Sequence, residues 1–269
     1  MRLSARRSIG WVFPLIVQVA IATGAIVGVI SLQSAQLQKS SKIESPQQAV
    51  QQEAIRLDAL SKLPSFGFDN LMASWTFLNF VQYYGDTPAR NETGYSLGLK
   101  YFDIITRRDP RFVDSYMFLW GTISYELGQP KVTQEYLKRG TDALSPQMHP
   151  RAFSVWRWSA TDQILLLGDL PGAARSMEMT AKWAAESEEF KQFAPFFQQT
   201  SAWLKTNPDI RLARFQTWLT VYLEAADSRT KARAKQEILA LGGVEKINDK
   251  GETGFVLPES LLPKKSPTR

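Results

Sequence analysis

Two neighbouring runs of regularly spaced apolar residues, between Asp109 and Gln147, give the strongest structural signal in the chain. Each run follows a proline, and Asp109-Pro110 adds an Asp that can cap the first N–H groups of a helix. The recurring positions are Tyr116, Leu119, Trp120 and Ile123 in the first run and Val132, Tyr136 and Leu137 in the second. Gly128 can supply the left-handed residue that ends the first helix, and Pro146 closes the second. The pattern predicts two helices joined by a short turn.

A helix pair within about 34 residues is typical of the tetratricopeptide repeat, and this stretch resembles that repeat. The matching positions are Trp120-Gly121 for the large apolar residue and glycine, Thr133 and Gly140 for the two small residues, and Leu137 for the large apolar residue between them. Two positions are shifted, because Tyr125 lies one place beyond the usual aromatic residue and Pro146 falls one place late. The resemblance implies a fold of helical hairpins with a surface that binds protein segments.

Helical patterns continue toward the C-terminus. The pair Leu127-Gly128 recurs as Leu167-Gly168, 40 residues later, and a proline follows each pair. This internal repeat predicts a helical array. Further helices are expected to start at Pro150, Pro195, Asn207-Pro208 and Asp227 or Ser228, and the last to end at Gly242-Gly243. We find no convincing alternating run bounded by hairpin turns, so the predicted fold is all-α: a tetratricopeptide-like α-solenoid behind a single N-terminal transmembrane helix.

The run from Asp69 to about Tyr84 predicts a helix that is apolar on most sides, which is typical of a helix that is buried or belongs to an interface. Leu71, Trp75, Leu78 and Val81 share one side, and Phe77, Phe80 and Tyr84 share another. The phrases Leu71 to Gly85 and Asp109 to Tyr116 resemble a set of bacterial membrane-anchored tetratricopeptide proteins. That resemblance implies an anchor followed by helical repeats and transfers no catalytic residue. The layout is also similar to that of cyanobacterial proteins, some of which help to assemble photosynthetic complexes.

The segment from Ile9 to Leu32 contains no charged residue. Its 24 residues would span about 36 Å as a helix, which is enough to cross a bilayer. Arg2, Arg6 and Arg7 precede it, so the positive-inside rule places the N-terminus in the cytoplasm and the rest of the chain on the periplasmic or lumenal side. A cleaved signal peptide and a buried helix are the alternatives. Gly24 and Gly28 have the spacing of a membrane-helix dimerisation motif, although a homodimer is not the favoured interpretation.

These patterns divide the chain into five predicted parts. They are a cytoplasmic N-terminus (1–8), a transmembrane helix (9–32), a polar stalk or linker (33–64), a helical domain (65–243) and a flexible C-terminal tail (244–269). Within the stalk, Ser45-Pro46-Gln47-Gln48 predicts a capped helix start. Its apolar stripe has two interpretations, packing on the first repeat or pairing with another chain.

Composition excludes several kinds of chemistry. The chain has no Cys and one His, His149, so we expect no His-based triad and no Cys- or His-ligated metal site. There is no glycine-rich phosphate loop, and no catalytic or cofactor-binding residue is predicted. The net charge of +6 is mild, and Arg229, Lys231, Arg233 and Lys235 alternate without aromatic residues, which is typical of a solvated helix face rather than a nucleic-acid site.

The remaining candidates are protein-binding residues. The predicted groove contains Tyr116, Trp120, Arg157 and Gln163, which lie on the first helices of two pairs, and the predicted docking helix contains Trp75, Phe77, Phe80 and Tyr84. We therefore expect a membrane-tethered, non-enzymatic scaffold or assembly factor that holds a protein client. Two alternatives are a stable accessory subunit of a larger membrane complex, such as a photosynthetic one, and an envelope enzyme. A polar-rimmed groove would favour the scaffold, whereas an exposed apolar patch would favour the subunit.

Overall fold

The computed structural model describes residues 45–247 and 253–261, together with seven isolated positions between residues 18 and 31. The chain forms two compact units, residues 1–49 and 50–269. The predicted membrane helix Ile9–Leu32 lies outside the described residues except at those isolated positions, as does the N-terminal segment 1–8. Within the part of the chain that the structure describes, no helix is both long and apolar enough to cross a membrane.

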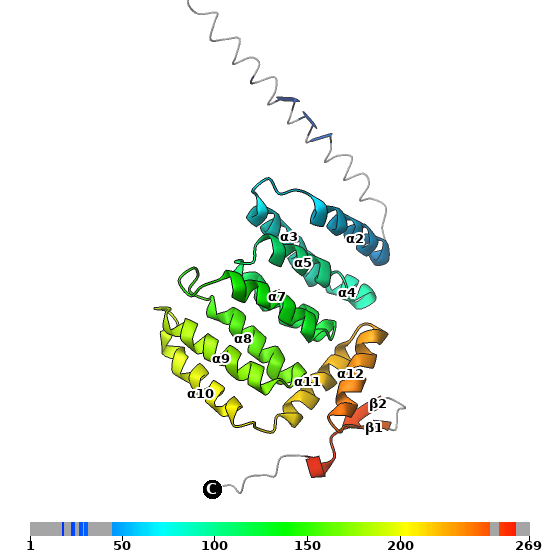
Figure 1. Ribbon diagram of the computed structural model, residues 1–269. Helices are drawn as coiled ribbons and strands as arrows, with labels where there is room; N and C mark the ends of the chain where they lie inside the picture. The colour runs from blue at the N-terminus through cyan, green and yellow to red at the C-terminus, as the bar shows by residue number, and fades with distance from the viewer. Residues whose placement is uncertain are drawn as a thin grey trace, which may run out of the picture. The chain divides into compact units, whose positions relative to one another are not determined.

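The second unit is mostly helical (Figure 1). Its elements, with α2 beginning four residues before the boundary, are α2 (Pro46–Lys62), α3 (Asp69–Gly85), α4 (Thr87–Thr93), α5 (Gly98–Arg108), η1 (Val113–Tyr116), α6 (Met117–Leu119), η2 (Trp120–Glu126), α7 (Pro130–Ala143), α8 (Phe153–Asp162), η3 (Gln163–Leu167), α9 (Leu170–Ala185), η4 (Lys191–Phe193), α10 (Ala194–Lys205), α11 (Arg211–Glu224), α12 (Ser228–Ala240), β1 (Val244–Ile247), β2 (Thr253–Val256) and η5 (Glu259–Leu261).

Helices that are close in the sequence pack against each other in the second unit. The main contacts join α3 to α5, α7 to α8, α8 to α9, and α9 to α10 (Figure 1). One hydrophobic core runs through these helices, from Leu57 on α2 to Leu204 on α10. A second core contains Leu166, Trp218 and Phe255, which come from η3, α11 and β2. The all-helical prediction is therefore right for most of the described chain.

The segment 46–62, predicted as a stalk, is instead packed into the folded unit. Its start is as predicted: Gln48 N donates to Ser45 Oγ at 3.3 Å, and Ser45 N donates to Gln48 Oε1 at 3.2 Å, which is a capping box. Leu57 is fully buried in the main core, and the Tyr101 hydroxyl on α5 donates to the carboxylate of Glu53. Of the two interpretations of the apolar stripe of α2, packing on the neighbouring helices is the one that the structure supports.

Three of the predicted helix starts are displaced by the same amount. After Pro110, Pro150 and Pro208 the helical segments begin three residues later, at Val113, Phe153 and Arg211. The residue before two of these prolines closes a turn instead of capping a helix: Asp109 Oδ1 accepts from Arg111 N at 3.1 Å, and His149 Nδ1 accepts from Arg151 N at 3.1 Å. His149 is therefore a turn residue.

The helices that precede the two Leu-Gly pairs end in wide π-helical turns, η2 and η3. In each case the residue after the glycine closes the turn, because Gln129 N donates to Ile123 O at 2.9 Å and Asp169 N donates to Gln163 O at 2.8 Å. Gly128 and Gly168 have φ angles of 58° and 70°, which an L residue adopts only at a cost. A π-helical turn adds one residue to an α-helix. This extra residue shifts Tyr125 by one place relative to an uninterrupted α-helix.

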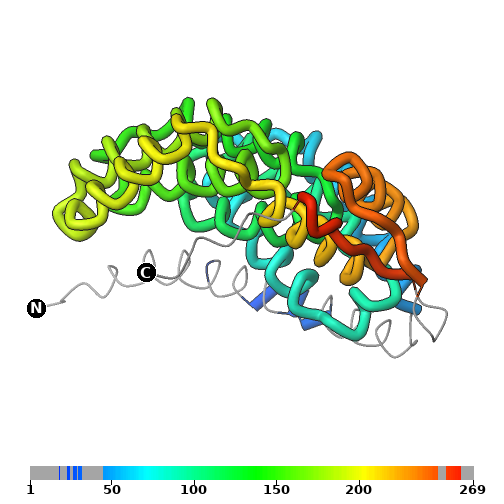
Figure 2. The backbone as a smooth tube through the Cα atoms, turned by 90° about the horizontal axis from the view of Figure 1, so that it is seen from below, coloured from blue at the N-terminus to red at the C-terminus, as the bar shows by residue number. Residues whose placement is uncertain are grey.

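The hairpin of α11 and α12 packs against the ends of these two π-helical turns (Figure 2). Arg233 Nη1 donates to Gly128 O at 2.9 Å. Trp218 Nε1 and Arg214 Nη2 both donate to Leu166 O at 3.1 Å. The last carbonyls of a helix lack partners within it. The C-terminal hairpin supplies donors to carbonyls at both ends.

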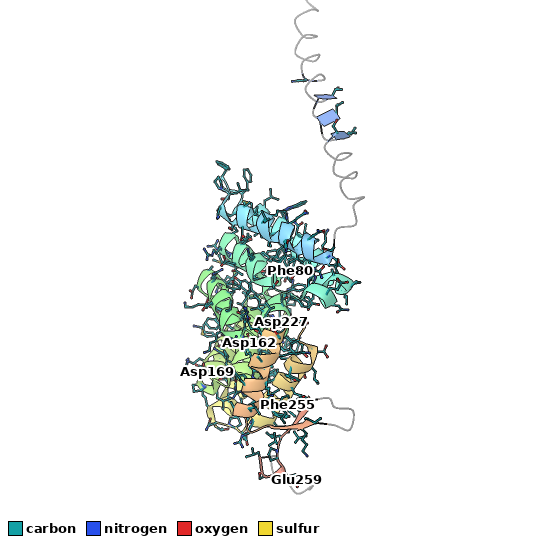
Figure 3. The ribbon with its side chains drawn as sticks, turned by 90° about the vertical axis from the view of Figure 1, so that its right-hand side faces the viewer. Phe80, Asp162, Asp169, Asp227, Phe255 and Glu259 are labelled. Atoms are coloured by element: carbon teal, nitrogen blue, oxygen red, sulfur yellow. The ribbon has the colours of Figure 1, made fainter. Side chains whose placement is uncertain are left out.

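The predicted C-terminal tail contains a short β-hairpin. Strands β1 and β2 pair antiparallel, with Val244 opposite Val256 and Ile247 opposite Thr253. Phe255 is 6% exposed, and its ring lies 5.0 Å from that of Tyr222 on α11 (Figure 3). The expectations of a loose tail and of a chain without strands are therefore wrong at 244–247 and 253–256. Strands of four residues are too short for their periodicity to be recognised.

Candidate protein-binding surfaces

Helix α3 has two apolar faces, and the described part of the chain covers only one of them. Ala73, Thr76, Phe80 and Tyr83 are buried. On the opposite face, Leu71, Trp75, Leu78 and Val81 are 63%, 58%, 58% and 42% exposed. These four side chains follow one another at intervals of four, three and three residues, so they form one continuous stripe along the helix. We call this stripe the α3 face.

Of the four residues predicted for the docking helix, only Trp75 belongs to the α3 face. Phe80 is fully buried, and its ring lies 4.6 Å from that of Phe102 on α5 (Figure 3). Phe77 and Tyr84 are half-buried, and the ring of Phe77 packs 5.0 Å from that of Phe112. The predicted choice is wrong for Phe80 because that side of the helix supplies the core. The helix is apolar on both sides, as its sequence predicts.

The loop before α3 extends this exposed apolar surface. Leu63, Phe66 and Phe68 are 52%, 85% and 61% exposed. Phe66 also has a φ of 50°, a left-handed conformation that is uncommon for a bulky residue. A smaller exposed group lies on and beside α10, where Phe196 and Trp203 are 64% and 49% exposed. The largest run of exposed apolar side chains in the described chain is therefore at α3 and its preceding loop.

The four predicted groove residues lie in different surroundings. Tyr116 is fully buried, with its hydroxyl donating to Pro110 O at 2.9 Å, and its ring fills the space that Gly140 leaves open. Tyr116 therefore holds the helix pair together and does not line a groove. Gln163 is half-buried, and its Oε1 accepts from Ser176 at 2.8 Å. These two side chains belong to internal contacts.

Trp120 and Arg157 remain partly accessible. The ring of Trp120 lies 5.3 Å from that of Tyr125, five residues later, which is a spacing that the π-helical turn brings onto one side. The guanidinium of Arg157 lies 4.5 Å from the ring of Trp158, and burial lowers the pKa of Arg157. Both residues keep the accessibility that a binding role requires.

Glu126, at the end of η2, is a carboxylate that the sequence analysis did not single out. It is half-buried, and within the described chain its carboxylate has no hydrogen bond and no ion pair. Burial, and then the carboxylate of Glu224 on α11, raise the pKa of Glu126 to about 7. Burial, followed by the charge of Glu126, also raises the pKa values of Tyr84 and Tyr95. A perturbed carboxyl beside aromatic rings is typical of a functional site.

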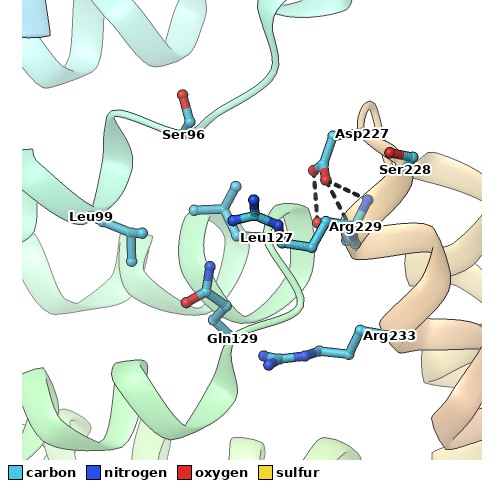
Figure 4. A pocket seen from close by; sticks show the side chains of 9 residues that line it. Ser96, Leu99, Leu127, Gln129, Asp227, Ser228, Arg229 and Arg233 are labelled. Atoms are coloured by element: carbon cyan, nitrogen blue, oxygen red, sulfur yellow. Dashed lines mark hydrogen bonds between the residues drawn. The ribbon is translucent and has the colours of Figure 1, made fainter.

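A cavity of about 530 Å³ lies at the turn that follows Glu126 in the chain (Figure 4). Leu127 and Gln129 form one of its walls, and Glu126 is not among its lining residues. Ser96 and Leu99 form the second wall, and the start of α12 forms the third. Figure 4 shows the side chains of Arg229 and Arg233 extending from α12 toward the turn that carries Leu127 and Gln129. Three distant segments thus enclose a space that contains two guanidinium groups.

A buried polar network joins the two π-helical regions. Asp162, fully buried at the end of α8, accepts from Ser124 Oγ on η2 at 2.6 Å, and Ser124 Oγ lies 2.7 Å from Thr133 Oγ1 on α7 (Figure 3). Burial raises the pKa of Asp162 to about 7, against the opposing effect of these hydrogen bonds. Asp162 has no access to solvent, so this network is structural.

The described residues contain no group of three or more His, Asp or Glu side chains arranged to hold a metal ion. In comparisons with protein-family models, with curated proteins and with solved structures, no match to this chain was found.

Proposed function

We propose that this protein is a membrane-tethered scaffold or assembly factor that holds a partner protein, and that the partner packs on the α3 face. The α3 face is the observation that carries the binding of a partner protein; because it is apolar, it does not select the scaffold over a permanent subunit. Folded proteins rarely expose a continuous apolar patch, and those that do generally use it for binding. The intervals between Leu71, Trp75 and Leu78 are those at which a helix contacts another helix or a hydrophobic groove.

The packing of α3 explains why this face remains free. Phe80 and Tyr83 already anchor α3 in the core, so the exposed face adds nothing to the stability of the protein by itself. Burial of large apolar side chains contributes about 25 cal/mol per Å². A Trp and three aliphatic residues, supported by Phe68 in the preceding loop, are therefore a substantial source of binding energy.

The membrane tether and the repeat type are further parts of the proposal. The uncharged segment Ile9–Leu32 supports an anchor, and the packing of successive helices supports a tetratricopeptide-like solenoid. The exposed apolar α3 face also favours a second candidate, a permanent accessory subunit of a membrane complex, because permanent interfaces are more apolar than transient ones.

Affinity purification from the native membrane in mild detergent tests the proposal. The full chain is compared with the double variant Trp75→Gln/Leu78→Gln and with the control Leu223→Gln, which changes a residue that is 61% exposed on α11. We expect one set of proteins to be recovered with the wild type and with the control and to be lost with the double variant. Recovery that does not change in the double variant would refute the assignment to α3. Stoichiometric recovery favours the subunit, and substoichiometric recovery favours the assembly factor.

A further inference from the structure

Two arginines line the cavity between the α4–α5 connection, the η2–α7 turn and the start of α12, and their guanidinium groups differ in the hydrogen bonds that they make. Arg233 donates from one nitrogen to Gly128 O at 2.9 Å, which fixes its side chain across the cavity. The guanidinium of Arg229 has no hydrogen-bond partner among the described residues. Both guanidinium groups line the cavity, and so do the uncharged polar side chains of Gln129 and Ser96.

Among the described residues that line this cavity, the one carboxylate already has hydrogen-bond partners. Asp227 Oδ1 accepts from the backbone N–H groups of Arg229 and Thr230, each at 2.9 Å, and Asp227 Oδ2 accepts from Thr230 Oγ1 at 2.7 Å (Figure 4). These bonds also occupy the N–H groups at the start of α12, so those groups are not open to a ligand. The guanidinium groups are the available hydrogen-bonding groups, and the cavity has a surplus of one positive charge.

We propose that this cavity binds a carboxylate presented by a peptide segment, with Arg229 as its main partner and Arg233 beside it. A guanidinium forms two parallel charge-assisted hydrogen bonds with a carboxylate. One carboxylate balances the surplus charge, whereas a phosphate dianion would exceed it and would be repelled by Asp227 more strongly than a singly charged carboxylate is. Leu99 and Leu127 give the cavity an apolar part that fits the methylene groups of a Glu side chain or a neighbouring apolar residue.

This inference rests on the proposed protein-binding function, because an acidic side chain of the partner would be the natural source of the carboxylate. The cavity and the α3 face are nevertheless tested separately. A short free peptide reports on the cavity alone, and the α3 face is not altered in that experiment.

The experiment titrates the full chain in detergent with acetyl-Leu-Glu-Leu-amide and follows by NMR the backbone amide signals of Ser96 and Leu127, which line the cavity and are the same in every variant. Acetyl-Leu-Gln-Leu-amide and inorganic phosphate are the two comparison probes. We expect saturable binding of the Glu peptide that weakens as salt is raised. The Gln peptide and phosphate should each bind at least about tenfold more weakly. Equal binding of the two peptides, or preferential binding of phosphate, would overturn the assignment.

Two variants test the residues. Arg229→Gln removes the free guanidinium but keeps the backbone N–H that Asp227 holds, and we expect it to weaken the Glu peptide at least about tenfold. Gln129→Glu places a competing carboxylate in the cavity, and it should block the peptide although both arginines remain. Lys231→Gln is the matched control, because it makes the same charge change on α12 outside this cavity. Binding that survives both Arg229→Gln and Gln129→Glu, or is lost equally with Lys231→Gln, would contradict the proposal.

Discussion

The two π-helical turns, η2 and η3, use the same backbone device for different purposes. Each ends in a Leu-Gly pair with a left-handed glycine, and each is bound by the hairpin of α11 and α12. The residue before the Leu-Gly pair differs. In η3 it is Leu166, which is 1% exposed and belongs to the second core. In η2 it is Glu126, a half-buried carboxylate that has no hydrogen bond or ion pair within the described chain.

The difference shows which features of the turn are structural. The glycine, the wide turn and the bound carbonyl recur in both places, so they hold the hairpin. The carboxylate occurs in only one of them, where an apolar residue would satisfy the packing. Because burial raises the pKa of Glu126, its ionised form should lower the stability of the folded protein.

The largest expected effect is on the free energy of unfolding, and it differs between alanine substitutions at Gly168 and at Gly128. A Cβ at residue 168 would lie 2.5 Å from Arg214 Nη1, whereas a Cβ at residue 128 would have its nearest contact at 3.4 Å, with Thr230. The left-handed conformation costs either alanine about 1–2 kcal/mol. Gly168→Ala also displaces Arg214 from Leu166 O, so we expect it to lower the free energy of unfolding by about 2–4 kcal/mol, against about 1–2 kcal/mol for Gly128→Ala. Denaturant unfolding of the full chain measures both losses. Equal losses would contradict the claim that Arg214 makes residue 168 the more sensitive position.

The next largest effect on stability comes from the buried hydrogen bond between Ser124 and Asp162, which links the two π-helical turns. Ser124→Ala removes a donor from the buried carboxyl of Asp162, and we expect it to cost about 1–3 kcal/mol. The folded-state pKa of Asp162 is about 7, above its unfolded value near 3.8. Its contribution to stability is therefore present in full at low pH and is lost as the pH rises from about 4 through 7.

Asp162→Asn isolates this contribution. The variant cannot ionise, so the decline in its unfolding free energy between pH 4 and pH 8 should be smaller than in the wild type. Ser124→Ala should make the decline steeper, because it withdraws a hydrogen bond from the charged form. Unfolding curves at pH 5 and pH 8 give the comparison. A pH dependence that is the same in Asp162→Asn and in the wild type would contradict the assigned pKa.

The smallest effect comes from making η2 resemble η3. Glu126→Leu installs the residue type found at position 166 and removes a carboxyl whose pKa is raised to about 7. Because that raised pKa favours the neutral form, the wild type loses stability as the pH rises from about 4.5 through 7, and the variant should not show this loss. We expect the variant to be more stable than the wild type at pH 8 by on the order of 1 kcal/mol, after allowance for the solvent exposure of Glu126.

Glu126→Gln serves as the control that keeps the side-chain shape and removes the charge. It should also abolish the pH dependence that Glu126 causes, with a smaller gain in stability than Glu126→Leu. A loss of stability at pH 8 in both variants would show that the carboxylate has a stabilising partner.

The sequence predicted the parts of the structure that rest on long helical periodicity. The two apolar sides of α3 and the recurrence of the Leu-Gly pair were visible because their spacing repeats over several turns. The site was less predictable. Nothing in a single sequence showed that Phe80 would face the core and Trp75 would not, because both sides of α3 are apolar and tertiary contacts decide between them.

Glu126 left one indirect sign in the sequence. The one-residue shift of Tyr125 marked the π-helical turn, and the alignment of Leu127-Gly128 with Leu167-Gly168 places Glu126 opposite Leu166. The cavity left no sign, since it depends on the packing of α12 against two segments more than 100 residues away along the chain. The β-hairpin was missed because its four-residue strands are too short to show a periodicity. Its packing on the protein also depends on a tertiary contact, the burial of Phe255.

Site-specific photocrosslinking in the cells that produce the protein tests the central claim, that the α3 face holds a protein partner. A photoreactive phenylalanine derivative replaces Trp75 or Leu78 on the α3 face, or Leu223 on α11 as an exposed control. The account predicts one discrete protein adduct, the same from positions 75 and 78 and absent from position 223. No protein adduct from positions 75 and 78, or the same adducts from all three positions, would contradict it.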